Sequence, residues 1–527
     1  MKPNAITAIS VSVLFSTLIT HVTTSKILFL LPIASKSHKN VFDPLIDALL
    51  SRGHELTVVS PVKSSKNYTN LREIHPVTVE EISNSPAMSG GNMFENRRKG
   101  KLAVLLSFDN TFIEEVCHKF YRNEEINGIL KTREKFDLAF VNAVPNQCVL
   151  GLVNYLNIPH IYLGSLPLTN AHIGGVGGFF PRSFVPSPFS PFIDKMSFME
   201  RVINFIIEML SGHLYYQKQS SDIYRQYLGN DIPTVEEIDR NVSMIFMNTN
   251  FLLTFPRPLL PDIVEVGGMH CKYGRKSKLP SDLEELLSGA EHGFIYFSLG
   301  SIIRTKNMPP EVRQKFLNVF AKLKQLVIWK WDNENETDLP ANVVVRKWLP
   351  QQDILDHPNI KLFITHGGLL STQESVFYGV PLLGAPLYVD QDLNMKQAEN
   401  LGQGLTLEIT DFTEESLEDK ITTIIFDQRY AQKAKQLSQI FRDQPETPTE
   451  RAVFWTEYVI RHKGATHLRS GARDLTAIQY HSLDVIMFLV IVSISSVTLV
   501  GMILLKVVQA ACLKLRQQNN VSKIKVN

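Results

Sequence analysis

The sequence predicts an α/β fold of two doubly wound parallel-sheet domains that face each other across a cleft, followed by one transmembrane helix. Two separate stretches, starting near residues 26 and 290, alternate short apolar strands with amphipathic helices, as the βαβ units of parallel sheets do. Residues 485–505 then form a run of 21 residues without a charge. A chain of 527 residues has room for two to four domains of roughly 100–200 residues each.

The composition excludes several classes of protein. Apolar residues make up 44% of the chain and charged residues 20%, which rules out global disorder. The net charge of +2 lacks the positive surplus of a nucleic-acid-binding protein, so no nucleic-acid partner is expected. The four cysteines are too few for a disulfide scaffold and are not spaced as a Cys-x-x-Cys site, so no metal centre is expected.

Residues 1–24 are predicted to be a cleaved signal peptide. Lys2 supplies the positive end, the stretch from Ala5 to Thr20 is uncharged and apolar or small, and Thr23 and Thr24 are small enough for signal peptidase. The apolar run is short for a membrane span, which weighs against the alternatives of a membrane anchor or a buried first helix.

Residues 25–266 are predicted to form the first α/β domain. A strand at 26–32, a helix at 41–51 and a strand at 54–60 make a βαβ unit, and later strands are expected at 136–141 and 158–163. The amphipathic stretch 192–210 keeps three interpretations open: a wall of a binding pocket, a helix on a membrane surface, or an ordinary core helix.

A Gly-, Lys-, Pro- and Ser-rich linker is predicted at 267–285 and the second α/β domain at 286–445. Its expected elements are a helix at 309–324 and strands at 294–299, 326–331, 343–347, 360–365, 381–385 and 404–408. Neither half carries a dinucleotide fingerprint or a P-loop, which argues against a dehydrogenase and an NTPase. Residues 446–484 are expected to be C-terminal helices before the membrane.

The charge-free run at 485–505 is predicted to cross the membrane, since 21 residues of helix are about 31 Å long. Lysines and an arginine follow it in the tail 506–527, which contains no acidic residue. Positive charge stays cytosolic, so we expect a single-pass type I protein with a lumenal body. Lys523 and Lys525 resemble a dilysine signal for retrieval to the endoplasmic reticulum, although a generic basic tail is the alternative. Sequons in the predicted lumenal body make three asparagines candidate glycosylation sites: Asn67, Asn241 and Asn335.

The chemistry is concentrated in residues 348–391. A predicted strand ends in His366-Gly367-Gly368, and Ser371 follows as the expected N-cap of a helix, a position suited to phosphate. Trp348 offers a flat face to a base, and Glu374 can accept two hydrogen bonds from a ribose diol. The turn Asp390-Gln391 offers groups suited to sugar hydroxyls. The ensemble predicts a site for a nucleoside diphosphate linked to a sugar.

This stretch resembles the signature of the UDP-glycosyltransferases, with every fixed spacing met from Trp348 to Gln391. The resemblance covers the whole chain and implies the GT-B architecture of two Rossmann-like domains. It implies that Trp348 and Gln351 hold uracil and that Glu374 holds the ribose. It also implies that His366, Ser371 and Ser301 hold the diphosphate, and that Asp390 and Gln391 hold the sugar.

The resemblance further implies a catalytic histidine shortly after the first strand, which is His38, expected in a loop at the carboxyl end of that strand. An imidazole there can take the proton of an acceptor hydroxyl. The family supports this histidine with an acid, whereas the corresponding position here is Asn142, and Gln147 stands where insect relatives have another aspartate. Neither amide supplies the charge that steadies an imidazolium.

The predicted function is transfer of a hexose, with glucose favoured, from a UDP-sugar to a small lipophilic acceptor with inversion. The UDP-sugar is a co-substrate, and no further cofactor is expected. Two alternatives remain: a UDP-glucuronosyltransferase, or a UDP-sugar-binding membrane protein with weak or no transferase activity. Assembly into a homo-oligomer is left open.

Overall fold

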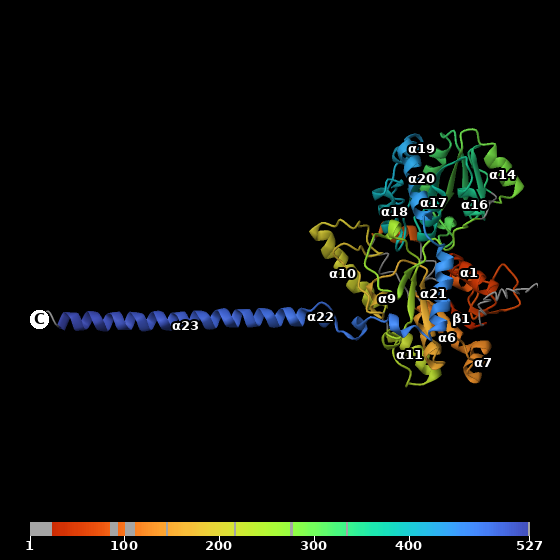
Figure 1. Ribbon diagram of the computed structural model, residues 1–527. Helices are drawn as coiled ribbons and strands as arrows, with labels where there is room; N and C mark the ends of the chain where they lie inside the picture. The colour runs from red at the N-terminus through yellow and green to blue at the C-terminus, as the bar shows by residue number, and fades with distance from the viewer. Residues whose placement is uncertain are drawn as a thin grey trace, which may run out of the picture.

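The computed structural model describes residues 24–84, 93–100, 111–143, 146–215, 218–274, 278–333 and 336–524. These residues form two α/β domains, and one long helix extends away from them (Figure 1). The predicted signal peptide up to residue 23, Asn335 and Lys525 lie outside the described residues. The predicted fold class is confirmed: both sheets are parallel throughout their recorded pairings.

The first sheet has seven described strands in the order β3-β2-β1-β4-β5-β6-β7. Its strands are β1 Lys26–Leu30, β2 Glu55–Val59, β3 Leu71–Ile74, β4 Leu138–Asn142, β5 His160–Gly164, β6 Met244–Met247 and β7 Ile263–Glu265. The strand order reverses between β1 and β4, so the segments that follow these two strands diverge to opposite faces and leave a crevice at their carboxyl ends.

The second sheet repeats the same arrangement in the order β10-β9-β8-β11-β12-β13. Its strands are β8 Phe294–Ser298, β9 Leu326–Lys330, β10 Val343–Arg346, β11 Ile360–Thr365, β12 Leu382–Gly384 and β13 Gly404–Thr406. Every residue of β8 is buried, as expected for a central strand covered by helices on both faces. The order reverses between β8 and β11, which places a second crevice beyond Ser298 and Thr365.

Helices cover both faces of each sheet (Figure 1). In the first half they are α1 Lys36–Ser51, α2 Val79–Asn84, α4 Met93–Arg98, α6 Thr111–Arg122, α7 Glu124–Thr132, α8 Leu150–Tyr155, α9 Asn170–Gly174, α10 Phe198–Tyr215, α11 Lys218–Leu228, α12 Val235–Asp239 and α13 Phe251–Thr254. In the second half they are α14 Ser281–Ser288, α15 Pro310–Phe320, α16 Gln351–Leu355, α17 Leu369–Tyr378, α18 Gln391–Asn400, α19 Glu414–Phe426 and α20 Gln428–Arg442. Helix α14 begins inside the stretch predicted as the linker.

Short 3₁₀ turns connect several elements: η1 Gln147–Val149, η2 Thr305–Asn307, η3 Thr466–Leu468 and η4 Gly471–Asp474. A disulfide joins Cys117 of α6 to Cys148 of η1, a bond that the sequence did not predict. It ties α6, which precedes α7 and β4 in the chain, to the turn after β4.

The chain returns to the first domain after α20. Helix α21, Pro448–Arg461, lies beside α1, and its buried residues Val453 and Val459 belong to the core on that face of the first sheet (Figure 1). Farther on, Arg473 forms a buried ion pair with Asp262 at the start of β7 (2.8 Å). The C-terminal segment therefore fastens the second half of the chain onto the first.

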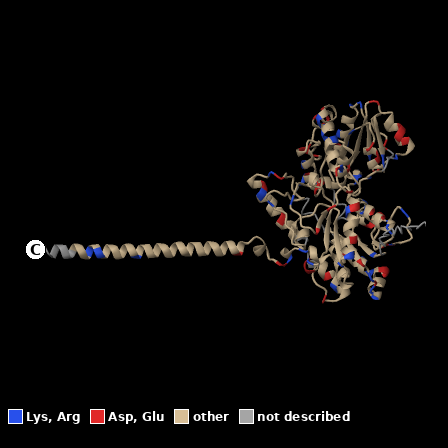
Figure 2. Cartoon of the chain, in the orientation of Figure 1, with Lys and Arg blue, Asp and Glu red and all other residues tan. Residues whose placement is uncertain are grey.

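Helix α22, Ala477–Tyr480, leads into α23, Leu483–Ile524, which extends away from the body (Figure 1). Residues Leu483–Asn519 are long and apolar enough to cross a membrane, and they make no buried contact with the body. Figure 2 shows this helix tan over most of its length and blue only towards its C-terminal end. The predicted span 485–505 lies inside α23, which continues as helix through much of the predicted tail.

Candidate functional site

A cavity of about 540 Å³ lies between the two domains, at the carboxyl ends of both sheets. All nine sequence-predicted site residues line it: His38, Ser301, Trp348, Gln351, His366, Ser371, Glu374, Asp390 and Gln391. His38 comes from the first domain and the other eight from the second. The structure thus brings the predicted residues together, and their individual roles stay predictions.

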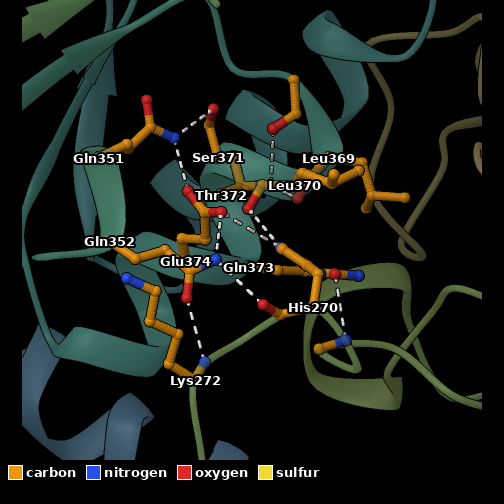
Figure 3. A network of polar contacts seen from close by, with 12 residues as sticks. His270, Lys272, Gln351, Gln352, Leu369, Leu370, Ser371, Thr372, Gln373 and Glu374 are labelled. Carbon is orange, nitrogen blue, oxygen red and sulfur yellow. Dashed lines mark hydrogen bonds and ion pairs between the residues drawn. The ribbon is translucent and has the colours of Figure 1, made fainter. Parts of the chain in front are cut away.

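Glu374 is the centre of a polar network on α17 and α16 (Figure 3). The amide of Gln351 donates to its Oε2 atom (2.5 Å) and the amide of Gln352 to its Oε1 atom (3.0 Å). His270 Nε2 lies 3.6 Å from Oε1. Burial raises the pKa of Glu374 to about 7, against the lowering effect of the two amide hydrogen bonds. The carboxyl group is therefore poised to change charge near neutral pH.

Gln351 is fixed in place before any ligand arrives. Besides Glu374, its amide nitrogen donates to Ser371 Oγ (3.1 Å), and its oxygen accepts from the Tyr296 hydroxyl (3.2 Å). Tyr296 lies in β8, where a buried aromatic residue looks like simple core in the sequence. These contacts orient the predicted base-binding side chain from two neighbouring elements, α17 and β8.

His366 sits between two glycines that leave room for its ring. A Cβ atom at Gly300 would lie 2.7 Å from the imidazole, and one at Gly368 would lie 2.5 Å from Nε2. The histidine ring occupies the space that a side chain at Gly368 would need. Burial, followed by the positive charge of Lys330, lowers the pKa of His366 to about 4. The ring is therefore neutral at pH 7.

The N-terminus of α17 differs from its prediction. The N-cap is Gly368, which has no side chain to cap the helix, and Ser371 lies within the first turn. The expectation that Ser371 is the N-cap is wrong, because the helix begins directly after the glycines. Asp390 accepts a hydrogen bond from the backbone N–H of Leu369 in that first turn. A helix start without a side-chain cap remains suited to an anion.

Asp390 and Gln391 form the turn into α18. Asn394 Nδ2 donates to Asp390 Oδ2 (2.7 Å), and burial raises the pKa of Asp390 to about 6. The Gln391 oxygen accepts from the backbone N–H groups of Leu387 and Tyr388 (2.7 and 2.9 Å). These bonds hold the oxygen of Gln391, and its amide group also has a nitrogen that can donate to a sugar hydroxyl.

Trp348 is 56% exposed, so it is not a core tryptophan. Lys36, the first residue of α1, lies over its ring with Nζ 3.6 Å from the centroid. Lys330 Nζ lies 5.7 Å from the same centroid and donates to the carbonyl oxygen of Gly300 (2.6 Å). A cation from the first domain thus lies over the ring that is predicted to stack on the base.

His38 lies in the first turn of α1, so the expectation that it lies in a loop is wrong. Ser35 is the N-cap, and its hydroxyl accepts from the backbone N–H of His38 (3.3 Å). Burial lowers the pKa of His38 to about 4, and a helix N-terminus also disfavours an imidazolium. The ring is neutral at pH 7, which is the form that accepts a proton.

Asn142, at the position where the family has an acid, makes no hydrogen bond to His38 among the described residues. Asn142 ends β4, and its oxygen accepts from the Ser165 hydroxyl (3.1 Å). Among the described residues, neither His38 Nδ1 nor Asn142 Nδ2 has a hydrogen-bond partner, although both atoms are buried. Gln147 lines the cavity and donates to the carbonyl oxygen of Ala143 (3.3 Å).

Several residues that position the site were missed by sequence reasoning. Gln352 supports Glu374, and Asn394 supports Asp390. Asn146 makes hydrogen bonds to both the N–H and the carbonyl of Ile33 (2.8 and 3.2 Å), which holds the segment leading to His38. The one available signal was position in the chain. Gln352 directly follows the predicted site residue Gln351, and Asn394 lies one helical turn after the predicted site residue Asp390.

Of the predicted glycosylation sites, Asn67 and Asn241 are exposed, as an acceptor asparagine must be. Their modification stays a prediction.

Comparisons with known proteins agree with this geometry. A family model described as UDP-glucoronosyl and UDP-glucosyl transferase matches residues 26–519. UDP-glucosyltransferase 2 from Dactylopius coccus is 36% identical over 485 residues, covering 91% of this chain and 92% of the relative. UDP-glucuronosyltransferase 1A6 from Homo sapiens is 34% identical over 478 residues, covering 86% and 87%.

Solved structures match the fold at low sequence identity. Spinosyn forosaminyltransferase SpnP has a TM-score of 0.55 at 15% identity, covering 83% of this chain and 99% of that one. Glycosyltransferase VinC in complex with DTDP has a TM-score of 0.53 at 16% identity, with the same coverage. Two facing Rossmann-like domains with a cavity between them define a GT-B glycosyltransferase. The family match and the relatives place the chain more closely: it belongs to the UDP-glycosyltransferase family and is a UDP-sugar glycosyltransferase.

Proposed function

We propose that this chain transfers a hexose, with glucose favoured, from a UDP-sugar to a hydroxyl group of a small lipophilic acceptor, with inversion. The observation that supports it is the shared cavity, which the predicted donor residues enter from one domain and His38 from the other. Its first-domain wall includes Phe112, Ile113, Leu166 and Phe189, which suits an apolar acceptor. The glucosyltransferase relative from an insect supports glucose.

In the proposed reaction, the acceptor oxygen attacks the anomeric carbon as the bond from that carbon to the diphosphate oxygen breaks. UDP leaves with the bonding electron pair, and the hydroxyl proton passes to the neutral imidazole of His38. Attack from the side opposite the leaving group inverts the anomeric configuration.

Product analysis tests this proposal. The purified chain is incubated with UDP-glucose or UDP-glucuronic acid and a panel of phenols and aliphatic alcohols. The products are identified by their masses in mass spectrometry. We expect hexosylated phenols with UDP-glucose and a β-linkage by NMR, because the donor is α-linked. A chain that binds UDP but forms no product with either donor contradicts the transferase proposal.

One observation favours a second candidate, a UDP-sugar-binding membrane protein with weak or no transferase activity. Within the described ranges His38 has no hydrogen bond on Nδ1, and Asn142 carries no charge to stabilise an imidazolium. Asn142→Asp discriminates the two candidates. A large gain in rate from a barely active parent supports the second candidate, whereas an already active parent supports the first.

We further propose a single-pass type I orientation in the endoplasmic reticulum membrane. The apolar helix α23 supports the span, and Lys506, Lys514 and Arg516 beyond it support a cytosolic tail. The Cys117–Cys148 disulfide supports an oxidising, lumenal environment for the body. Retention by Lys523 and Lys525 rests on the sequence pattern alone.

A further inference from the structure

We propose that Arg97 is a positioning residue that acts from the first half of the chain on the predicted sugar-binding turn, Asp390-Gln391. The inference rests on the proposed function, because it concerns how the donor sugar is recognised. Arg97 lies in α4, which precedes all the residues that the sequence singled out for the donor.

Helix α4 is docked on the second domain although it belongs to the first half of the sequence. Met93 and Phe94 are 7% and 1% exposed and belong to the same buried cluster as Leu387 and Phe412 of the second domain. In Figure 1 a short orange segment lies beside α18, among the green and blue elements of that domain. Met93 also lines the central cavity. The helix thus bridges the two halves next to the site.

Arg97 holds two carboxylates of the second domain at once. Its Nη1 and Nη2 atoms donate to the two oxygens of Asp392 (2.6 and 2.9 Å). Its Nε and Nη2 atoms donate to Glu408 (3.1 and 2.7 Å). The side chain is only 4% exposed. A buried, two-pronged guanidinium–carboxylate pair fixes orientation as well as distance.

The ion pair between Arg97 and Asp392 directly adjoins the predicted sugar-binding turn. Asp392 lies in the first turn of α18, immediately after Gln391 and two residues after the N-cap Asp390. A shift of this turn would move both residues relative to the sugar. The side chains predicted to hold uracil and ribose lie on α16, α17 and the loop before α16. In the part of the chain that the structure describes, the hydrogen bonds of Arg97 go to Asp392 and Glu408 and not to these elements. Loss of Arg97 should therefore weaken binding of the sugar part of the donor and leave binding of the nucleotide part unchanged.

The test compares Arg97→Met with a matched control, Arg98→Met, in the full detergent-solubilised chain. Arg98 follows in the same helix and pairs with Glu311 (2.6 Å), but both side chains are about half exposed. Calorimetry measures the Kd of UDP and of UDP-glucose for each variant. We expect Arg97→Met to weaken UDP-glucose about tenfold, the scale of one charged hydrogen bond, with UDP unchanged. Arg98→Met should leave the Kd of both ligands unchanged. Arg97→Lys should weaken UDP-glucose binding less than Arg97→Met does.

Equal weakening of UDP and UDP-glucose by Arg97→Met would overturn the inference, since it would indicate a general structural role. Unchanged binding of both ligands would overturn it as well. If Arg97→Met does not fold, Asp392→Asn removes one charge while keeping the side-chain volume, and the same pair of constants decides. Failure of the parent itself to bind UDP would instead contradict the proposed function, so the two failures are distinguishable.

Discussion

At the scale of single residues, Glu374 shows how burial can set the pH range of a binding site. Its carboxyl group has a pKa near 7, although two glutamine amides donate to it. A ribose diol donates hydrogen bonds and therefore binds the ionised carboxylate of Glu374 better than the protonated form. Below pH 7 the carboxyl group must lose its proton when the ligand binds, which costs free energy. Binding should weaken as the pH falls through 7.

We therefore predict that UDP-glucose binds about fourfold more weakly at pH 6.5 than at pH 8, as expected for one group with this pKa. UDP-glucose is the suitable probe, because its diphosphate does not take up a proton in this range. Glu374→Gln should bind about ten- to a hundredfold more weakly at pH 8 and lose the pH dependence. A Glu374→Gln variant that keeps the parental pH dependence would assign it to another group.

His38 leads to a second prediction at this scale. Burial lowers its pKa to about 4, so the imidazole is neutral and able to accept a proton at any pH well above that value. The kcat of the parent at saturating donor should stay nearly constant from pH 8 to about pH 5 and fall only below it. Asn142→Asp adds a negative charge that favours the imidazolium, which raises the pKa and moves the acidic fall in kcat to higher pH.

Rate profiles of the parent, Asn142→Asp, His38→Ala and the double variant check this. The charge at 142 should raise the rate only when His38 is present, since the acid acts through the imidazole. Near-parental transfer by His38→Ala to an aliphatic alcohol would show that another group is the base.

At the scale of elements, the Cys117–Cys148 disulfide connects α6 to the turn that follows β4. The two cysteines are 31 residues apart and buried, and β4 ends in Asn142 between them. The bond therefore restrains the unfolded chain and braces the segment that carries Asn146 and Gln147 against α6.

We predict that Cys117→Ala/Cys148→Ala lowers the free energy of unfolding by about 2–4 kcal/mol. Thermal denaturation with and without a reducing agent measures this. The reductant should lower the Tm of the parent but not that of the double variant. Cys512→Ala is the control, because Cys512 carries a free, exposed thiol, and its Tm should fall with the reductant as the parental Tm does. An identical parental Tm in both buffers would show that the bond does not stabilise the native protein.

At the scale of the whole molecule, several elements join the two domains, among them the linker, α4 and the C-terminal segment. The last of these matters for topology, because α21 and the Arg473–Asp262 pair tie the first domain to the chain just before α23. The apolar helix α23 therefore extends from the first domain.

We predict that protease added to sealed microsomes removes an epitope tag placed after residue 527 and leaves the body intact. Detergent should then expose the body to digestion, as the control. Digestion of the body in intact vesicles would contradict a lumenal orientation.

Patterns that are local in the chain were readable from the sequence. The strands at 26–30, 55–59, 294–298 and 360–365 were predicted because buried parallel strands are continuous apolar runs. The edge strand β3, Leu71–Ile74, was not predicted, because half-exposed positions and two charged residues hide it. Helix α1 begins at Lys36 rather than 41 because Ser35 caps it, a signal that lay in the sequence and was overlooked.

The fold class, the apolar span and the set of residues that line the cavity could be predicted from the sequence, since motifs and hydrophobic periodicity are properties of neighbouring residues. The donor-binding roles of those residues stay predictions. How those residues are supported and charged depends on the packing of the folded chain. The raised pKa of Glu374 and the lowered pKa of His38 arise from burial, which depends on residues far away in the chain. The docking of α4 by Arg97 joins positions about 300 residues apart, and no local pattern specifies such a contact.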